Sequence, residues 1–220
     1  MLNFACNVIY TGKTFLRRLY NLTIGKTNKN STITINNEVK QDLSMWLTFL
    51  KQFNGYCMFM SDRWFSNRTL NLYTDAAQSI GYGGILGKEW FHGTWTEQDK
   101  KLDITTLELY PIVVAVNLWG EKLSNLNLNI HTDNQSLVYI INNQTVKGND
   151  NCLALLRAFV LACLKHSILI KAHHIPGKEN VLSDLLSRRQ VNQFKELSKN
   201  MSSTPVHIPP ELSLGNLLLT

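Results

Sequence analysis

The chain has 220 residues, which is enough for one domain with its own core and additional segments. Its composition, 44% hydrophobic and 17% charged, is that of a globular protein. No stretch of about 18 apolar residues predicts a membrane span, and the N-terminus lacks the features of a signal peptide. We therefore expect an intracellular protein, in the cytoplasm, the nucleus or both, that is neither secreted nor bound to a membrane.

The formal net charge of +6 is concentrated near the N-terminus. Residues 1–66 carry a net charge of +5, residues 67–190 carry +1, and the rest of the chain is neutral. A basic segment beside a charge-balanced body suggests a polyanion-binding surface next to a site that needs acids of its own. An ordinary solvated basic surface explains the same pattern, and charge alone does not decide between the two.

The apolar pattern divides the chain into three parts. Apolar residues recur at helical spacing over residues 37–53, which predicts an amphipathic helix whose wide apolar face needs a partner. Turn residues follow in 54–67, and strands are expected from about Arg68. From about Val191 the chain becomes polar, which predicts an extended linker or tail. The expected parts are a helical segment at 1–66, a folded domain at 67–190 and a polar tail at 191–220.

Two predicted strands each end in an aspartate. Apolar and polar residues alternate from Leu70 to Asp75, and again from Leu126 to Asp133. Two short strands with several glycines, near residues 82–86 and 90–95, are expected to be antiparallel hairpin partners of the first strand.

The segment between the two aspartate strands predicts a crossover helix through residues 111–118. A strand, a crossover helix and a second strand normally form a right-handed unit with parallel strands. The C-terminal ends of both strands then lie at one edge of the sheet, where α/β proteins tend to bind ligands. We therefore expect Asp75 and Asp133 to be neighbours at that edge.

Two further acids are expected at the same edge. Glu108 lies in the first turn of the crossover helix, and Asp184 lies in a short helix that opens at Asn180. Each of the four acids also has a structural explanation, as part of a capping box, as a partner of a helix dipole or as the start of a turn. Together, however, four carboxylates at one edge repel one another strongly unless cations are bound. Mg²⁺ is the cellular ion suited to such ligands, so the pattern predicts a metal site.

The ordered set of motifs resembles the ribonuclease H domain of retroelement polymerases, most closely that of the tyrosine-recombinase retrotransposons of the DIRS group. The motifs are Tyr73-Thr74-Asp75-Ala76, Thr106-Leu107-Glu108-Leu109, His131-Thr132-Asp133-Asn134, His174-Ile175-Pro176-Gly177-Lys178-Glu179-Asn180 and Ser183-Asp184-Leu185-Leu186-Ser187-Arg188. The resemblance covers about residues 67–190. Residues 12–19 and 46–50 also look like the polymerase thumb and connection. Ala77 and Ser183 depart from the family pattern, but each replaces one small residue by another.

The resemblance implies an α/β ribonuclease H-like fold, with a mixed five-stranded sheet and flanking helices, preceded by a small helical segment. It also implies an endonuclease that cuts the RNA strand of RNA:DNA hybrids with two Mg²⁺ ions, for which Mn²⁺ can substitute. Asp75 and Asp133 would be the central metal ligands, and Glu108 and Asp184 would complete the site. His174 matches the family's mobile histidine for proton transfer or product release; strand alternation puts the adjacent histidine on the opposite face.

The expected partners are an RNA:DNA hybrid and the polymerase portion of the same element. A hybrid carries 2′-hydroxyls on one strand only, and contacts to its backbone carry little base information. The candidate nucleic-acid-binding residues are Lys13, Arg17, Arg18, Asn134 and Asn180. Polymerase chemistry is excluded for this chain because the sequence contains no adjacent pair of aspartates.

Two other functions fit the same sequence. The first is a catalytically silent ribonuclease H fold, kept as a nucleic-acid-binding or connection module of a decayed or domesticated element. The second is a transposase-like strand transferase. It is disfavoured because such enzymes usually end their acidic set with a glutamate, where this chain has Asp184.

Overall fold

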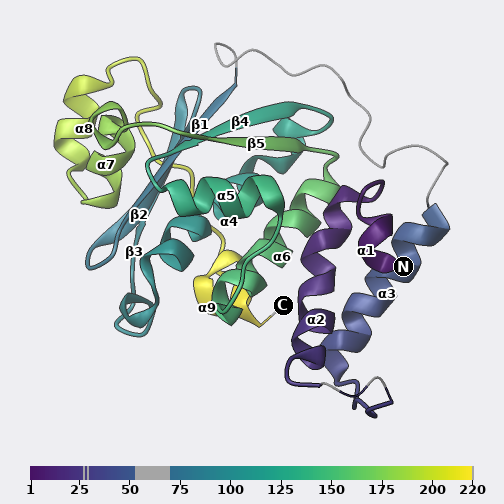
Figure 1. Ribbon diagram of the computed structural model, residues 1–220. Coiled ribbons are helices and arrows are strands. Elements are labelled where there is room, and N and C mark those ends of the chain that lie inside the picture. Colours follow the sequence, from purple (N-terminus) through teal and green to yellow (C-terminus); the bar gives the residue numbers. More distant parts are fainter. Residues whose placement is uncertain (27, 29, 53–69, 220) are drawn as a thin grey trace.

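The computed structural model describes residues 1–26, 28, 30–52 and 70–219, and a five-stranded sheet lies at its centre (Figure 1). The strand order is β3-β2-β1-β4-β5. The strands are β1 (Asn71–Ala77), β2 (Gly81–Leu86), β3 (Glu89–Thr94), β4 (Asn127–Thr132) and β5 (Leu169–His174). The predicted α/β class with a mixed five-stranded sheet is confirmed.

The strand pairing agrees with most of the predicted topology. β1 pairs antiparallel with β2, and β2 pairs antiparallel with β3, so β3 is a partner of β2 and not of β1. β1 and β4 are parallel, with Leu72 opposite Ile130, and β4 and β5 are also parallel. The strand predicted to end at Asp75 continues to Ala77, because pairing with β2 extends to that residue.

Three helices cover one face of the sheet and enclose the main core. They are α4 (Ile104–Leu123), α5 (Gln135–Asn143) and α6 (Asp150–Lys165). Strand residues that point to this face, such as Leu72 and Ile130, are completely buried. α4 is the predicted crossover helix, and it is longer than the predicted stretch 111–118. Its buried residues are spread around the whole helix, as expected for a helix at the centre of a domain.

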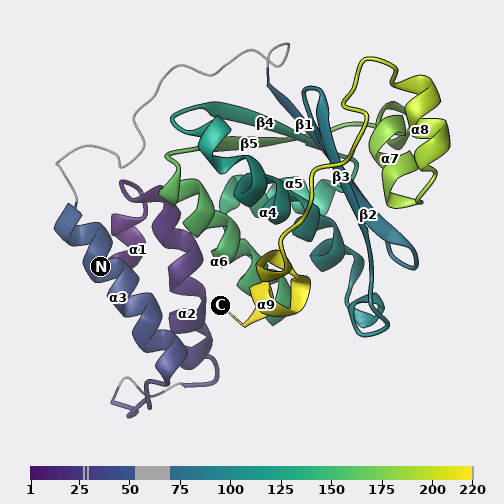
Figure 2. The same ribbon diagram turned by 180° about the vertical axis from the view of Figure 1, so that it is seen from behind.

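A smaller layer covers part of the opposite face. It contains α7 (Val181–Ser187) and α8 (Val191–Leu197), which lie at the end of the molecule away from α1–α3 (Figures 1 and 2). α7 packs on β1 and β2, and its Leu185 and Leu186 form a second apolar cluster with Ile85, Trp90 and Phe194. The helix that carries Asp184 therefore covers part of the sheet face that carries Asp75.

The N-terminal helices pack against α6. They are α1 (Leu2–Ala5), the 3-10 helix η1 (Tyr10–Leu16), α2 (Arg17–Thr23) and α3 (Asn37–Gln52). α3 is the helix predicted at 37–53; Phe53, the turn residues 54–67 and the expected strand start at Arg68 lie outside the described residues. The apolar face of α3 finds its partner in η1, where Phe15 packs against Phe49.

A buried ion pair ties the N-terminal helices to α6. The Arg157 guanidinium donates to the Asp42 carboxylate of α3, and both side chains are almost completely buried. The same guanidinium lies 5.0 Å from the centre of the Phe15 ring. Thr14 also donates a hydrogen bond of 2.9 Å to the Gln144 carbonyl. The N-terminal helices thus belong to the same core as the sheet.

The predicted extended tail is wrong, because the C-terminal residues fold onto the domain. After α8, the backbone amides of Ser202 and Val206 donate to the carbonyls of Lys88 and Trp90 at β3. The chain then ends in α9 (Leu214–Leu218), which packs against α6. Polar residues and prolines separate the apolar residues of this segment, and Phe194, Leu214 and Leu217 are buried. The segment lacks a regular apolar period, so the sequence pattern does not show which of its apolar residues are anchored in the core. None of the helices in the described part of the chain is both long and apolar enough to cross a membrane.

We predict that Asp42→Ala lowers the free energy of unfolding by about 3–5 kcal/mol, because it leaves the Arg157 guanidinium buried without its counter-charge. Chemical denaturation measures the difference. The control is Glu38→Ala on the same helix, where the exposed glutamate pairs with Arg18 and should contribute about 1 kcal/mol or less. Equal losses in the two variants would contradict a special role for the buried pair.

Candidate active site

Asp75 lies in β1 on the face opposite Leu72, in contact with the last residue of α7. The Ser187 hydroxyl donates a hydrogen bond to Oδ2 of Asp75. The pKa of Asp75 is raised to about 6; burial is the main cause, the charges of Asp133 and Asp184 contribute, and the Ser187 hydrogen bond opposes the rise. Asp75 therefore lies within electrostatic reach of two other predicted metal ligands.

Glu108 lies in α4, but it does not cap that helix. The N-cap is Asp103, whose side chain accepts from the Thr106 amide at 3.0 Å, so the capping-box explanation for Glu108 is excluded. The pKa of Glu108 is raised to about 8; burial is the main cause, the charges of Asp133 and Asp75 contribute, and a hydrogen bond from Asn134 opposes the rise. Its Oε2 is buried and has no hydrogen-bond partner among the described residues. A buried carboxylate oxygen in this state needs a proton or a cation.

Asp133 follows directly after β4 and is exposed, with the loop after β5 close to it. A Cβ placed on Gly177 would lie 3.2 Å from Oδ2 of Asp133, so glycine lets this loop approach the carboxylate. The His174 Nε2 lies 3.1 Å from the backbone carbonyl of Asp133. Because a carbonyl only accepts, this contact requires the proton on Nε2. His173 instead bonds to Asn129, so His174 is the histidine beside Asp133, as preferred from the sequence.

Asp184 lies in α7 and is paired with a basic residue one turn later. Nε of Arg188 donates to Oδ1 of Asp184 at 2.7 Å, with side-chain exposures of 51% and 40%. A solvent-exposed i,i+4 pair of this kind contributes only about 0.3–0.5 kcal/mol. The pair is therefore weak enough to be replaced by a stronger counter-ion.

The four acids interact electrostatically, but their side chains are not arranged as the ligands of a metal ion. Within the described ranges, no three His, Cys, Asp or Glu side chains form a group that could hold a metal ion as it stands. The donor set still fits a hard divalent cation, because it offers only carboxylate oxygens, one of them buried without a partner. The raised pKa values of Asp75 and Glu108 also indicate a cation site, because repulsion between carboxylates contributes to them and a bound cation would remove that repulsion.

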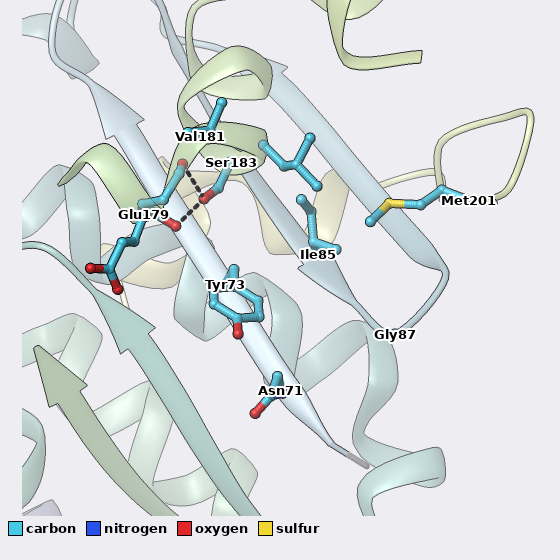
Figure 3. Close-up of a pocket in the computed structure, with 10 residues that line it drawn as sticks. Asn71, Tyr73, Ile85, Gly87, Glu179, Val181, Ser183 and Met201 are labelled. Carbon is cyan, nitrogen blue, oxygen red and sulfur yellow. Dashed lines mark hydrogen bonds between the residues drawn. The ribbon is translucent and has the colours of Figure 1, made fainter. Parts of the chain in front are cut away.

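A pocket of about 400 Å³ lies beside this site, between β1, β2 and the start of α7 (Figure 3). Tyr73, two residues before Asp75 on the same face of β1, points into it, and Met201 approaches from the C-terminal segment. Asn180 also lines the pocket, but it is only 2% exposed. Its amide donates to the Thr74 carbonyl at 3.0 Å, and its Oδ1 accepts from the Ser183 hydroxyl. Asn180 thus holds α7 against β1, a structural role that the sequence did not reveal.

The remaining candidates for nucleic-acid binding are placed in two different regions. Asn134 lies beside the acids, where it caps α5 by accepting from the Leu137 amide. Lys13, Arg17 and Arg18 belong to the N-terminal helices, at the other end of the molecule from α7 (Figures 1 and 2). Arg18 is paired with Glu38 and Asp42 and is 18% exposed. The structure does not bring these basic residues to the carboxylates, and their binding role stays a prediction.

Ser187 and Arg188 belong to the last of the sequence motifs, but the sequence assigns no role to either residue. Ser187 and Arg188 follow Asp184 by three and four positions, and both contact candidate metal ligands. Residues at these spacings share one side of a helix, so the spacing is the signal that could have identified them.

A comparison with protein families identifies the central part of the chain. Residues 66–159 match the model of the RNase H-like domain found in reverse transcriptase. This stretch is therefore an RNase H-like domain of the reverse transcriptase type. It includes Asp75, Glu108 and Asp133, whereas His174 and Asp184 lie beyond it. No curated protein matches the chain.

Solved structures with some likeness include two RNase H1 proteins and a viral enzyme. RNase H1 from the halophilic archaeon Halobacterium salinarum is 15% identical, with 56% of this chain and 98% of that chain covered and a TM-score of 0.44. LC11-RNase H1, isolated from compost by a metagenomic approach, is 14% identical, with coverages of 57% and 96% and a TM-score of 0.40. Prototype foamy virus protease-reverse transcriptase is 12% identical, with a TM-score of 0.30. That match covers 78% of this chain but only 23% of the viral protein.

We predict that Glu108→Gln removes a pH-dependent loss of stability from the metal-free protein. Folding raises the pKa of Glu108 from 4.5 to about 8. The contribution of Glu108 to the free energy of unfolding is therefore fully present below pH 4.5 and is lost as the pH rises through 8. Each pKa unit corresponds to about 1.4 kcal/mol, so the variant should be more stable by on the order of a few kcal/mol above pH 8. Chemical denaturation of the parent and the variant at pH 5 and pH 8.5, with a chelator present, measures the difference in their free energies of unfolding. The same difference at both pH values would contradict the prediction.

Proposed function

We propose that this chain hydrolyses the RNA strand of RNA:DNA hybrids with two Mg²⁺ ions, as the ribonuclease H part of a retroelement reverse transcriptase. The observation that carries the proposal is the electrostatic interaction among the acids: in addition to burial, which is the main cause of both shifts, Asp133 and Asp184 raise the pKa of Asp75, and Asp133 and Asp75 raise that of Glu108. The match of residues 66–159 to the reverse transcriptase type of RNase H-like domain supports the same activity. Mn²⁺ is the expected substitute ion, and the DIRS group is the kinship that the motifs favour.

Each residue of the proposed site has a defined task. Asp75 and Asp133 would hold the ions from the centre of the sheet edge, and Glu108 and Asp184 would complete the ligand set. The ions, when bound, would supply Lewis-acid stabilisation of the charge that builds up on the phosphate during in-line attack. His174 is exposed beside Asp133 and keeps its proton on Nε2, so Nδ1 is the atom at which a neutral ring would accept a proton.

The expected substrate follows from the placement of this site at an open sheet edge. Asp133 and His174 are exposed, so an extended duplex can reach them. Contacts there would be made with the sugar-phosphate backbone, which makes cleavage largely independent of sequence. The 2′-hydroxyls of one strand are the feature that would distinguish a hybrid from double-stranded DNA. The polymerase portion of the same element is the proposed protein partner.

A catalytically silent nucleic-acid-binding module is the second candidate. The observation that favours it is the Asp184–Arg188 ion pair, in which a basic side chain of the same helix already neutralises one proposed ligand. The two candidates differ in whether a divalent ion displaces Arg188 from Asp184.

We predict that the chain cleaves a labelled RNA:DNA hybrid in Mg²⁺, and that Asp75→Asn or Asp133→Asn reduces cleavage to background. An amide has the shape of the carboxylate but lacks the charge that holds the ion. Without metal, each variant should melt at the same temperature as the parent or higher, because one repelling charge is gone. The labelled RNA is analysed by gel electrophoresis, and a labelled DNA duplex serves as the substrate control. Cleavage by either variant at the parent rate would rule out the assigned site.

We also predict that Mg²⁺ and Mn²⁺ raise the melting temperature of the protein, because an ion that binds only the folded state stabilises it. The gain is about 2.7 kcal/mol when the ion is present at one hundred times its dissociation constant. Ca²⁺ should bind without supporting turnover. Asp133→Asn is the control and should show a smaller shift than the parent. A parent protein that shows neither a shift nor cleavage in millimolar Mg²⁺ would favour the silent module.

A further inference from the structure

The β2 strand has no side chains where α7 crosses it. A Cβ placed on Gly83 would lie 2.4 Å from Cβ of Leu186, closer than such atoms approach in proteins. A Cβ on Gly81 would lie 2.2 Å from the Gly93 carbonyl oxygen and 3.3 Å from that of Ser187. Glycine at these positions therefore lets the helix backbone lie directly on the strand. Any side chain at position 83 must push α7 away from the sheet.

The close approach brings Ser187, the last residue of α7, to the neighbouring strand β1. Its side chain is completely buried, and its hydroxyl contacts two acceptors, Oδ2 of Asp75 and the Asp184 carbonyl at 2.9 Å. The hydroxyl has a single hydrogen, and a charged carboxylate is a stronger acceptor than a carbonyl. Ser187 therefore donates to Asp75 and joins the two elements that carry candidate metal ligands.

We propose that Ser187 is a positioning residue that fixes the carboxylate of Asp75 for divalent-ion binding, and that Gly83 is required because it lets Ser187 reach that carboxylate. The inference rests on the proposed function, since it concerns the same metal site. Ser187 acts through Asp75. Rotation about the last torsion of an aspartate is weakly restricted, so a hydrogen bond to one oxygen decides which way the carboxylate plane faces.

The simpler explanation is that Ser187 only closes the end of α7. Serines near helix ends commonly bond to a carbonyl three or four residues earlier, and the contact with Asp184 has that form. In that case, removing the hydroxyl would lower stability and leave metal affinity unchanged. Metal affinity therefore separates the two roles.

The first experiment is calorimetric titration of Ca²⁺ into the full chain and into Ser187→Ala. The affinity of Ser187→Ala should fall about 10- to 100-fold, as expected when a residue that orients a metal ligand is removed. The matched control is Ser183→Ala, because Ser183 is as deeply buried on the same helix but bonds to Asn180, which is not among the proposed metal ligands. The control should bind Ca²⁺ like the parent. Parent-like Ca²⁺ affinity of Ser187→Ala would overturn the proposal.

A second variant, Gly83→Ala, keeps the hydroxyl and moves the helix that carries it. It should also weaken Ca²⁺ binding. Gly215→Ala is its control, because a Cβ there meets nothing within 4 Å. The double variant Ser187→Ala/Gly83→Ala should bind about as weakly as the weaker single variant, since both changes break one contact. Fully additive losses would overturn the link between Gly83 and Ser187.

The outcomes also distinguish this inference from the proposed function. If the parent binds neither Ca²⁺ nor Mg²⁺, the metal site itself is wrong and both proposals fail. If the parent binds Ca²⁺ and cleaves hybrid, while Ser187→Ala retains the parent Ca²⁺ affinity, only the role of Ser187 is wrong.

Discussion

Mutual repulsion among carboxylates at one edge of the sheet is the constraint on which the site depends. The pKa values of Asp75 and Glu108 are raised to about 6 and about 8, mainly because both carboxyl groups are buried and in addition because other acids lie close to them. The backbone keeps them there: β1 and β4 are parallel neighbours, and the residues behind the acids, such as Leu72 and Ile130, are fully buried. A well-packed sheet can hold such groups in place against their repulsion, which is a common property of sites that bind cations.

Strand patterns and connection rules were sufficient to predict the position of this edge. Alternation identified β1 and β4, and the crossover rule made them parallel, which placed Asp75 near Asp133. The same reasoning failed where tertiary contacts decide. Glycine-rich segments have no side-chain periodicity, so the order of β2 and β3 had to come from the structure. The prediction of an extended C-terminal tail is wrong because apolar residues such as Phe194 and Leu214, which are irregularly spaced in the sequence, anchor the segment to the domain.

Long-range charge pairing was beyond the reach of sequence patterns. Arg157 is a single basic residue in an apolar helix, and its partner Asp42 lies 115 positions earlier in the chain. Neither the spacing nor the composition connects the two residues. Arg18 was predicted to bind nucleic acid from the local excess of positive charge, yet it lies against Glu38 and Asp42. The net charge of a segment therefore says little about which of its charges remain available to a partner.

The C-terminal segment also covers the edge strand β3 of the sheet. β3 is the last strand on its side, and a strand in that position offers unpaired backbone groups to any extended chain. The amides of Ser202 and Val206 bond to the Lys88 and Trp90 carbonyls, and the Trp90 indole donates to the Ser202 carbonyl at 2.7 Å. The protein thus protects this edge with its own chain. Loss of the segment would expose the backbone groups of β3 together with the apolar side chains that Phe194, Leu214 and Leu217 pack against, so the domain would be less stable and able to self-associate through β3.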